Sequence, residues 1–133
     1  MITRNLAGRT LKAIGLGVMA LDEYKPRANE YGAFELLRHA AKIGVDLFDT
    51  ADVYGLGRNE ILIGKSLNDE EKNKVLIATK AGCTRPGGFR WDTDGRPEHI
   101  KEAIKGSLER LGIKQIELYQ LHAPDNKVPI INS

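Results

Sequence analysis

Apolar runs of strand length alternate along this chain with segments whose apolar residues recur at helical spacing. Short apolar runs bounded by polar or turn residues predict buried strands. They cover residues 11–20, 45–49, 74–79 and 115–121. Helices are predicted for residues 29–43, 59–67 and 97–111. The order is therefore βαβαβαβ, which calls for parallel strands joined by right-handed crossovers.

Residues with strong positional preferences mark the ends of these helices. Asn29 can cap the first helix and Gly44 can end it. Pro97 suits the first turn of the last helix, and Gly112 closes it. The connecting segments carry no predicted element: a lead-in over residues 1–10, a turn over 68–74, a long loop over 81–96 and a tail over 123–133.

The spacing of the strand ends narrows the fold class. These ends fall near residues 19, 49, 80 and 122, so two of the three intervals are about 30 residues, one-eighth of a barrel of roughly 250 residues. We therefore predict an α/β fold of the (β/α)₈ TIM-barrel type, with residues 1–133 forming about four βα units, the N-terminal half of the barrel. A flavodoxin-like open sheet shares this element order and is the alternative.

Composition and charge exclude several function classes. The chain has 20 basic and 18 acidic residues, a net charge of +2, and no Lys or Arg run of the kind that binds nucleic acid. No stretch reaches the roughly 18 apolar residues of a membrane span, and the polar N-terminus lacks the apolar core of a signal peptide. The single cysteine, Cys83, fits a reducing cytoplasm. We expect a cytoplasmic protein without a metal site.

Three polar side chains stand at the carboxyl ends of predicted strands. Asp49, Lys80 and His122 each follow an apolar run, and Tyr54 lies in a glycine-bearing loop five residues after the aspartate. The active site of a (β/α)₈ barrel lies where these strand ends converge. Taken singly, each residue has an ordinary structural role: a cap, a packed aromatic, a solvated charge and a structural histidine. Together they indicate a catalytic site.

Three motifs in this order resemble the aldo-keto reductase family: DTADVYG at 49–55, IATK at 77–80 and LYQLHAPD at 118–125. The resemblance extends from about residue 11 to 130. It implies a (β/α)₈ barrel that transfers hydride from NADPH to a small-molecule aldehyde or ketone. It also implies a catalytic tetrad and a stretch against the nicotinamide. The tetrad is Asp49, Tyr54, Lys80 and His122, and the cofactor residues are Gly17, Val18 and Met19, together with Asp49.

The chemistry of carbonyl reduction needs these residue types. Hydride addition builds an alkoxide, so a donor must protonate the oxygen as it forms. A free tyrosine, with a pKa of about 10, is a reluctant donor near neutral pH, and a neighbouring ammonium such as that of Lys80 favours the phenolate form. Lys80 in a dry site needs a counter-charge, for which Asp49 is suited. His122 can donate to the carbonyl oxygen and orient it.

Two further sequence features allow more than one interpretation. Residues 15–20 (GLGVMA) satisfy the dinucleotide pattern G-x-G-x-x-A, but charged residues and Pro26 follow where a helix should begin, so we interpret them as a barrel strand. Trp91, in the long loop, is predicted to line a substrate pocket with Tyr54 and His122; simple packing within that loop is the equal alternative.

The length of the chain opens other hypotheses. Members of the family that it resembles have eight βα units and bind the cofactor phosphates mostly in the second half, whereas this sequence stops after its fourth predicted strand. One alternative is a truncated, non-catalytic remnant that associates with itself or with a partner. Another is an assembly in which two copies close one barrel. In either case, the exposed face of a half barrel favours self-association.

Overall fold

The computed structural model describes residues 2–21, 30–87 and 90–133. Its centre is a parallel four-stranded sheet in the order β3-β4-β5-β8. These strands are β3 (Leu16–Gly17), β4 (Leu47–Asp49), β5 (Leu76–Ala81) and β8 (Leu118–Leu121). Neighbours in the sheet follow one another along the chain, whereas a flavodoxin-like sheet has the order 2-1-3-4-5. The barrel prediction is therefore confirmed, as a partial α/β barrel.

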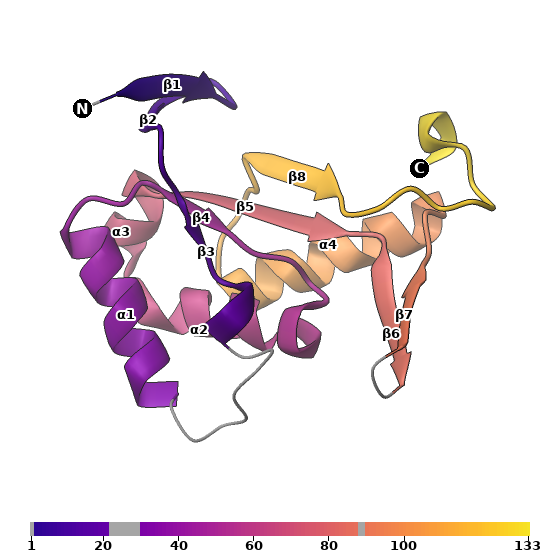
Figure 1. The fold of residues 1–133 in the computed structure, drawn as a ribbon, viewed down its shortest axis with the longest axis horizontal. Coiled ribbons are helices and arrows are strands. Elements are labelled where there is room, and N and C mark those ends of the chain that lie inside the picture. The colour runs from indigo at the N-terminus through magenta and orange to yellow at the C-terminus, as the bar shows by residue number, and fades with distance from the viewer. Residues whose placement is uncertain (1, 22–29, 88–89) are drawn as a thin grey trace.

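The helices lie against one face of this sheet (Figure 1). They are α1 (Glu30–Lys42), α2 (Arg58–Ser66), α3 (Asp69–Lys74) and α4 (Pro97–Leu111). The predicted ends at Gly44 and Gly112 both have positive φ, of 85° and 62°, a conformation that glycine adopts at no steric cost. The predicted cap Asn29 lies outside the described residues.

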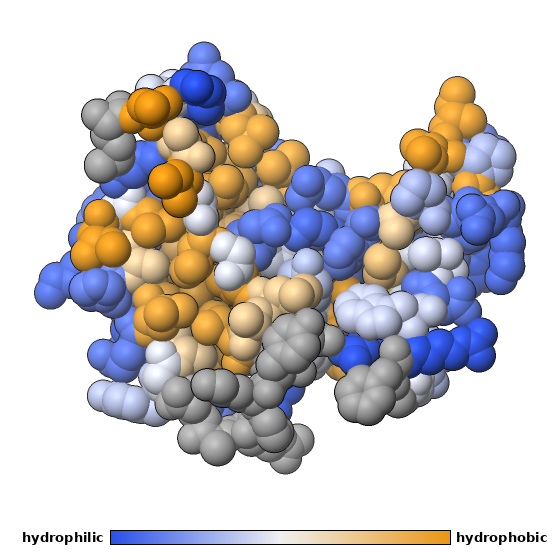
Figure 2. Space-filling view, in the orientation of Figure 1, coloured by the Kyte–Doolittle hydropathy of each residue, from blue (hydrophilic) through white to orange (hydrophobic). Residues whose placement is uncertain are grey.

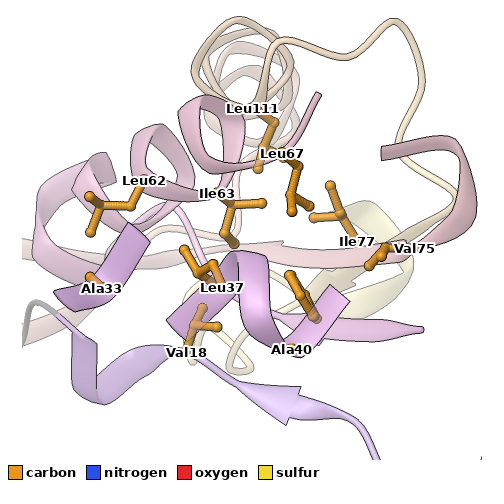
Figure 3. Packing of buried hydrophobic residues seen from close by; sticks show 11 residues of the cluster. Val18, Ala33, Leu37, Ala40, Leu62, Ile63, Leu67, Val75, Ile77 and Leu111 are labelled. Carbon is orange, nitrogen blue, oxygen red and sulfur yellow. The ribbon is translucent and has the colours of Figure 1, made fainter. Parts of the chain in front are cut away.

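The main core lies between the sheet and the helices. Ile77 points from the sheet toward side chains of α1, α2 and α4, among them Leu37, Ile63 and Leu111 (Figure 3). Phe48 of β4 belongs to the same buried cluster. Burying such a side chain contributes about 1.5–3 kcal/mol. The helices pack closely because α2 carries a glycine at the crossing: a Cβ on Gly64 would lie 2.9 Å from backbone atoms of Leu111.

The structure of the N-terminal residues differs from the sequence prediction. Residues 1–10 were expected to form a loose lead-in, but β1 (Thr3–Leu6) and β2 (Arg9–Lys12) form an antiparallel hairpin. Its two turn residues, Ala7 and Gly8, both have positive φ, as the tightest hairpin turns require. The hairpin places Leu11 over the face of the sheet that is turned away from the helices, which we call the inner face. There Leu11 packs with Leu76 and Ala78.

Other local predictions were also wrong. The strand expected over residues 11–20 is divided between β2 and β3, and a 3₁₀ turn (Met19–Leu21) follows. The expected turn at 68–74 contains α3, because Asn68 and Glu71 form a capping box. The expected long loop contains a second hairpin, β6 (Cys83–Gly87) and β7 (Arg90–Thr93), and the tail contains a 3₁₀ turn (Ile130–Asn132).

In the part of the chain that the structure describes, β3 and β8 each have a neighbouring strand on one side only. In the orientation of Figure 1, Figure 2 shows a hollow above β8, between the β1–β2 hairpin and the C-terminal segment. Hydrophobic side chains gather over β2, β3 and β4 in the same view. Within the described residues, no helix is long and apolar enough to cross a membrane.

Candidate active site

An ion pair joins the carboxyl ends of β4 and β5. Lys80 Nζ lies 2.8 Å from Asp49 Oδ2 and also donates to the backbone oxygen of Thr50 at 2.7 Å. The lysine side chain is only 13% exposed, and a buried ammonium needs such a partner. Lys80 lies inside β5, with one further residue before the strand ends, rather than just beyond it as the sequence predicted.

Tyr54 and His122 meet beside this ion pair. The Tyr54 side chain is buried, and its OH lies 3.5 Å from His122 Nε2. The two rings meet edge to face, with centroids 5.5 Å apart and an interplanar angle of 80°. Lys80 Nζ lies 5.4 Å from the centroid of the Tyr54 ring. The structure thus brings Asp49, Tyr54, Lys80 and His122 together at one end of the sheet.

The loop that carries Tyr54 turns sharply into α2. Gly55, Leu56 and Gly57 all have positive φ, and Gly57 is the residue before α2 begins. A Cβ on Gly57 would lie 2.7 Å from Cδ of Arg110 on α4. A side chain here would be both strained by its φ and crowded. The glycines therefore allow the loop to hold Tyr54 against the sheet while α2 packs on α4.

His122 is favoured in its neutral form. Burial lowers its pKa from the ordinary value, the positive charge of Lys80 lowers it further, and Asp49 opposes the shift. A neutral imidazole has one donor and one acceptor nitrogen. Among the described residues, His122 Nδ1 is buried without a hydrogen-bond partner. The other nitrogen, Nε2, is the one that faces Tyr54.

The predicted cofactor residues lie next to Asp49. Gly17 pairs with Asp49 in the β3–β4 register, and a Cβ on Gly17 would meet no atom of the described residues within 4 Å. The side chain of Val18 is buried in the main core (Figure 3), so only its main chain faces the strand ends. Met19 is exposed. The main chain of residues 17–19 is therefore accessible, with open space next to it, beside the Asp49–Lys80 ion pair.

Trp91 occupies a different position from the tetrad. It lies in β7, on the hairpin that projects from the sheet (Figure 1). Its side chain is 47% exposed, and the guanidinium of Arg85 lies 4.8 Å above its ring. This cation–π contact within the hairpin accords with the packing alternative, while a pocket role stays a prediction.

A buried polar cluster on the helix side of the sheet was not predicted. Glu60 is fully buried; its carboxylate accepts from Arg110 Nε at 2.7 Å and from Thr79 Oγ1 at 2.6 Å. Burial, reinforced by the charge of Glu60, raises the pKa of Asp52 to about 7. Arg110 lies 50 residues from Glu60 along the chain, so local periodicity does not predict their contact.

Asp52 should make the stability of the fold depend on pH. Its carboxyl group holds a proton to about pH 7 when folded, but only to about pH 4 when unfolded. Its favourable contribution is therefore complete below about pH 4 and is lost as the pH rises to about 7. Asp52→Asn cannot ionise, so it should gain roughly 2–4 kcal/mol over the wild type between about pH 4 and pH 8. Urea unfolding at several pH values measures this gain, and a difference that stays constant would contradict it.

Comparison with known proteins finds the same fold and related sequences. A profile of the Aldo/keto reductase family matches residues 13–133. Probable aldo-keto reductase 1 of Glycine max is 36% identical over 124 residues, which are 92% of this chain and 36% of that protein. The chain thus spans about a third of the length of this curated relative.

Solved structures give the same result. Aldo-keto reductase AKR11C1 from Bacillus halodurans, in a holo form, superposes with a TM-score of 0.85 at 33% identity, over 99% of this chain and 43% of that one. The glycerol dehydrogenase AKR11B4 from Gluconobacter oxydans gives 0.79 at 34% identity, over 93% and 39%. The sequence motifs, the partial barrel and these matches agree: the chain belongs to the aldo/keto reductase family.

Proposed function

We propose that residues 1–133 form the N-terminal half of an aldo-keto reductase barrel, and that they supply the proton-transfer residues for NADPH-dependent reduction of an aldehyde or ketone. One observation carries this proposal: an aspartate, a lysine, a tyrosine and a histidine from separate segments meet at the carboxyl ends of the strands. That end of the sheet is where barrel enzymes carry their active sites.

In this proposal the tyrosine is the general acid. A bound nicotinamide cofactor would supply the hydride for the carbonyl carbon. The role of Tyr54 is to give its proton to the oxygen on which negative charge develops. The ammonium of Lys80, near the Tyr54 ring, favours the phenolate that remains. Asp49 holds the ammonium in place through the 2.8 Å ion pair. His122, favoured as neutral imidazole, can donate to the same oxygen and orient it.

The open segment next to Asp49 supports the cofactor part of this proposal. The open space at Gly17 lets a flat group approach the backbone closely. We propose that the main chain at Gly17, Val18 and Met19 forms one wall of the cofactor site, with Asp49 at its edge. Small-molecule carbonyl compounds would be the substrates, and the cytoplasm the compartment.

Turnover should depend on the rest of the barrel. The chain spans 36% of the Glycine max relative and 43% of the Bacillus halodurans one. The inner face of the sheet is partly covered, since Leu76 and Ala78 are buried beneath Leu11. We propose that residues 1–133 by themselves bind NADPH weakly and associate through the edges of β3 and β8, because unpaired parallel edges favour association.

The experiment that tests the function uses a completed barrel: residues 1–133 extended by the four remaining βα units of a family member such as the Bacillus halodurans enzyme. We expect this protein to oxidise NADPH only when an aldehyde such as a nitrobenzaldehyde is present. A folded barrel that binds NADPH but shows no aldehyde-dependent oxidation over a panel of aldehydes and ketones would contradict the proposal.

A further inference from the structure

Residues 17–19 leave the sheet at the carboxyl end of β3, next to the candidate active site. The β3–β4 ladder ends with the pair Gly17 and Asp49, and the chain then turns into the 3₁₀ segment Met19–Leu21. The backbone N–H of Val18 still donates to the carbonyl of Asp49 at 3.0 Å. Beyond that bond, the parallel ladder no longer fixes the path of the main chain.

A side chain from α2 continues the anchoring where the ladder stops. Asn59 Nδ2 donates to the backbone oxygen of Val18 at 2.9 Å and lies 3.4 Å from that of Met19. Asn59 is only 1% exposed, so this amide is shielded from water, which would otherwise compete for the same carbonyls. The Val18 carbonyl also accepts from Leu21 N–H at 3.0 Å within the 3₁₀ turn, so the bond from Asn59 is the one that ties this turn to α2. A buried amide donor left without its acceptor would cost free energy, which favours this geometry.

Asn59 is also connected to the tyrosine through the chain. It is the second residue of α2, just after the positive-φ turn that follows Tyr54. The adjacent Glu60 accepts from Thr79, the residue before Lys80. The first turn of α2 thus holds residues 18 and 19, just beyond β3, through Asn59, and it holds β5, the strand of Lys80, through Glu60.

We infer that Asn59 is a positioning residue for the cofactor. It does not touch the nicotinamide itself but fixes the position of the backbone of residues 17–19, against which the nicotinamide lies. This inference rests on the proposed function, because it assumes that the segment is the cofactor wall. Removal of the amide donor unties residues 17–19 from α2 and leaves the Val18 carbonyl with only its local bond from Leu21 N–H. The segment can then move, while Tyr54, Lys80 and His122 keep their own contacts. The affinity for NADPH should therefore fall more than the rate of proton transfer.

Asn59→Ala and Asn59→Asp in the completed barrel test this inference. We expect KM for NADPH to rise roughly fivefold to tenfold, with kcat, KM for the aldehyde and the pH profile of kcat nearly unchanged. In the cofactor-free protein, amide hydrogen exchange at residues 18–21 should become faster. The matched control is Ser66→Ala, which removes another buried side-chain bond to a carbonyl, Ser66 Oγ to Leu62 O at 2.6 Å, at the far end of α2.

The outcomes separate this inference from the proposed function. If the Asn59 variants affect NADPH binding and amide exchange no more than Ser66→Ala does, the positioning role is wrong even in an active enzyme. If the Asn59 variants lower kcat and raise both KM values together, the residue acts on the whole fold and the inference is also wrong. A folded wild-type barrel that binds no NADPH would contradict both the function and the inference.

Discussion

Tyr54→Phe in the completed barrel should lower kcat for aldehyde reduction by about a hundredfold to ten-thousandfold, the usual contribution of a positioned general acid. The ring remains, so its edge-to-face contact with His122 and its place beside Lys80 persist. Only the proton donor is lost. NADPH binding, followed by fluorescence titration, should therefore stay within about twofold of the wild-type value.

Tyr119→Phe is the matched control for this substitution. Tyr119 lies in β8, and its hydroxyl group is buried without a hydrogen-bond partner among the described residues. Burial raises its pKa above the ordinary value, which makes it a poorer acid. Loss of the hydroxyl group in Tyr119→Phe should therefore leave kcat nearly unchanged. Equal turnover in wild type and Tyr54→Phe would remove the tyrosine from the proposed mechanism.

The second large effect is expected at the buried ion pair of α2 and α4. Arg110→Leu leaves the fully buried carboxylate of Glu60 without its charged partner. An uncompensated buried charge typically costs about 3–5 kcal/mol, a large part of the total stability of a small domain. Urea unfolding should show the loss directly, and cells should yield much less folded protein.

A double variant separates the charge from the packing. Glu60→Gln combined with Arg110→Leu removes both charges and keeps an acceptor for Thr79, so it should recover most of the lost stability. The exposed pair of Lys74 and Glu70, 2.6 Å apart, provides the control: Lys74→Ala should leave the free energy of unfolding nearly unchanged. If Arg110→Leu is no more harmful than Lys74→Ala, the buried pair has no structural role.

The sequence was sufficient for the parts of the fold that depend on long periodic segments. Apolar periodicity and end signals such as Pro97 and Gly112 predicted α4 correctly. The same reasoning failed for short elements. The β1–β2 hairpin depends on the conformation of Ala7 and Gly8, and α3 depends on a capping box over a segment without an apolar stripe.

The site residues that lie at or next to strand ends were brought together as the sequence predicted. Asp49, Lys80 and His122 were predicted from the ends of apolar runs, because the carboxyl ends of neighbouring parallel strands meet at one edge. The anchoring by Asn59 and the Glu60–Arg110 pair could not be predicted in this way. Both depend on how α2 packs against β3 and α4, and no local pattern specifies that packing.

The most direct test of the central claim follows the hydride itself. The completed barrel is given a nitrobenzaldehyde and NADPH that carries deuterium at both positions of the nicotinamide C4, and the alcohol is analysed by mass spectrometry and NMR. The proposed reaction predicts one deuterium on the carbinol carbon of the wild-type product, and almost no alcohol from Tyr54→Phe. Alcohol that lacks deuterium at that carbon, or deuterated alcohol formed equally well by Tyr54→Phe, would contradict the account.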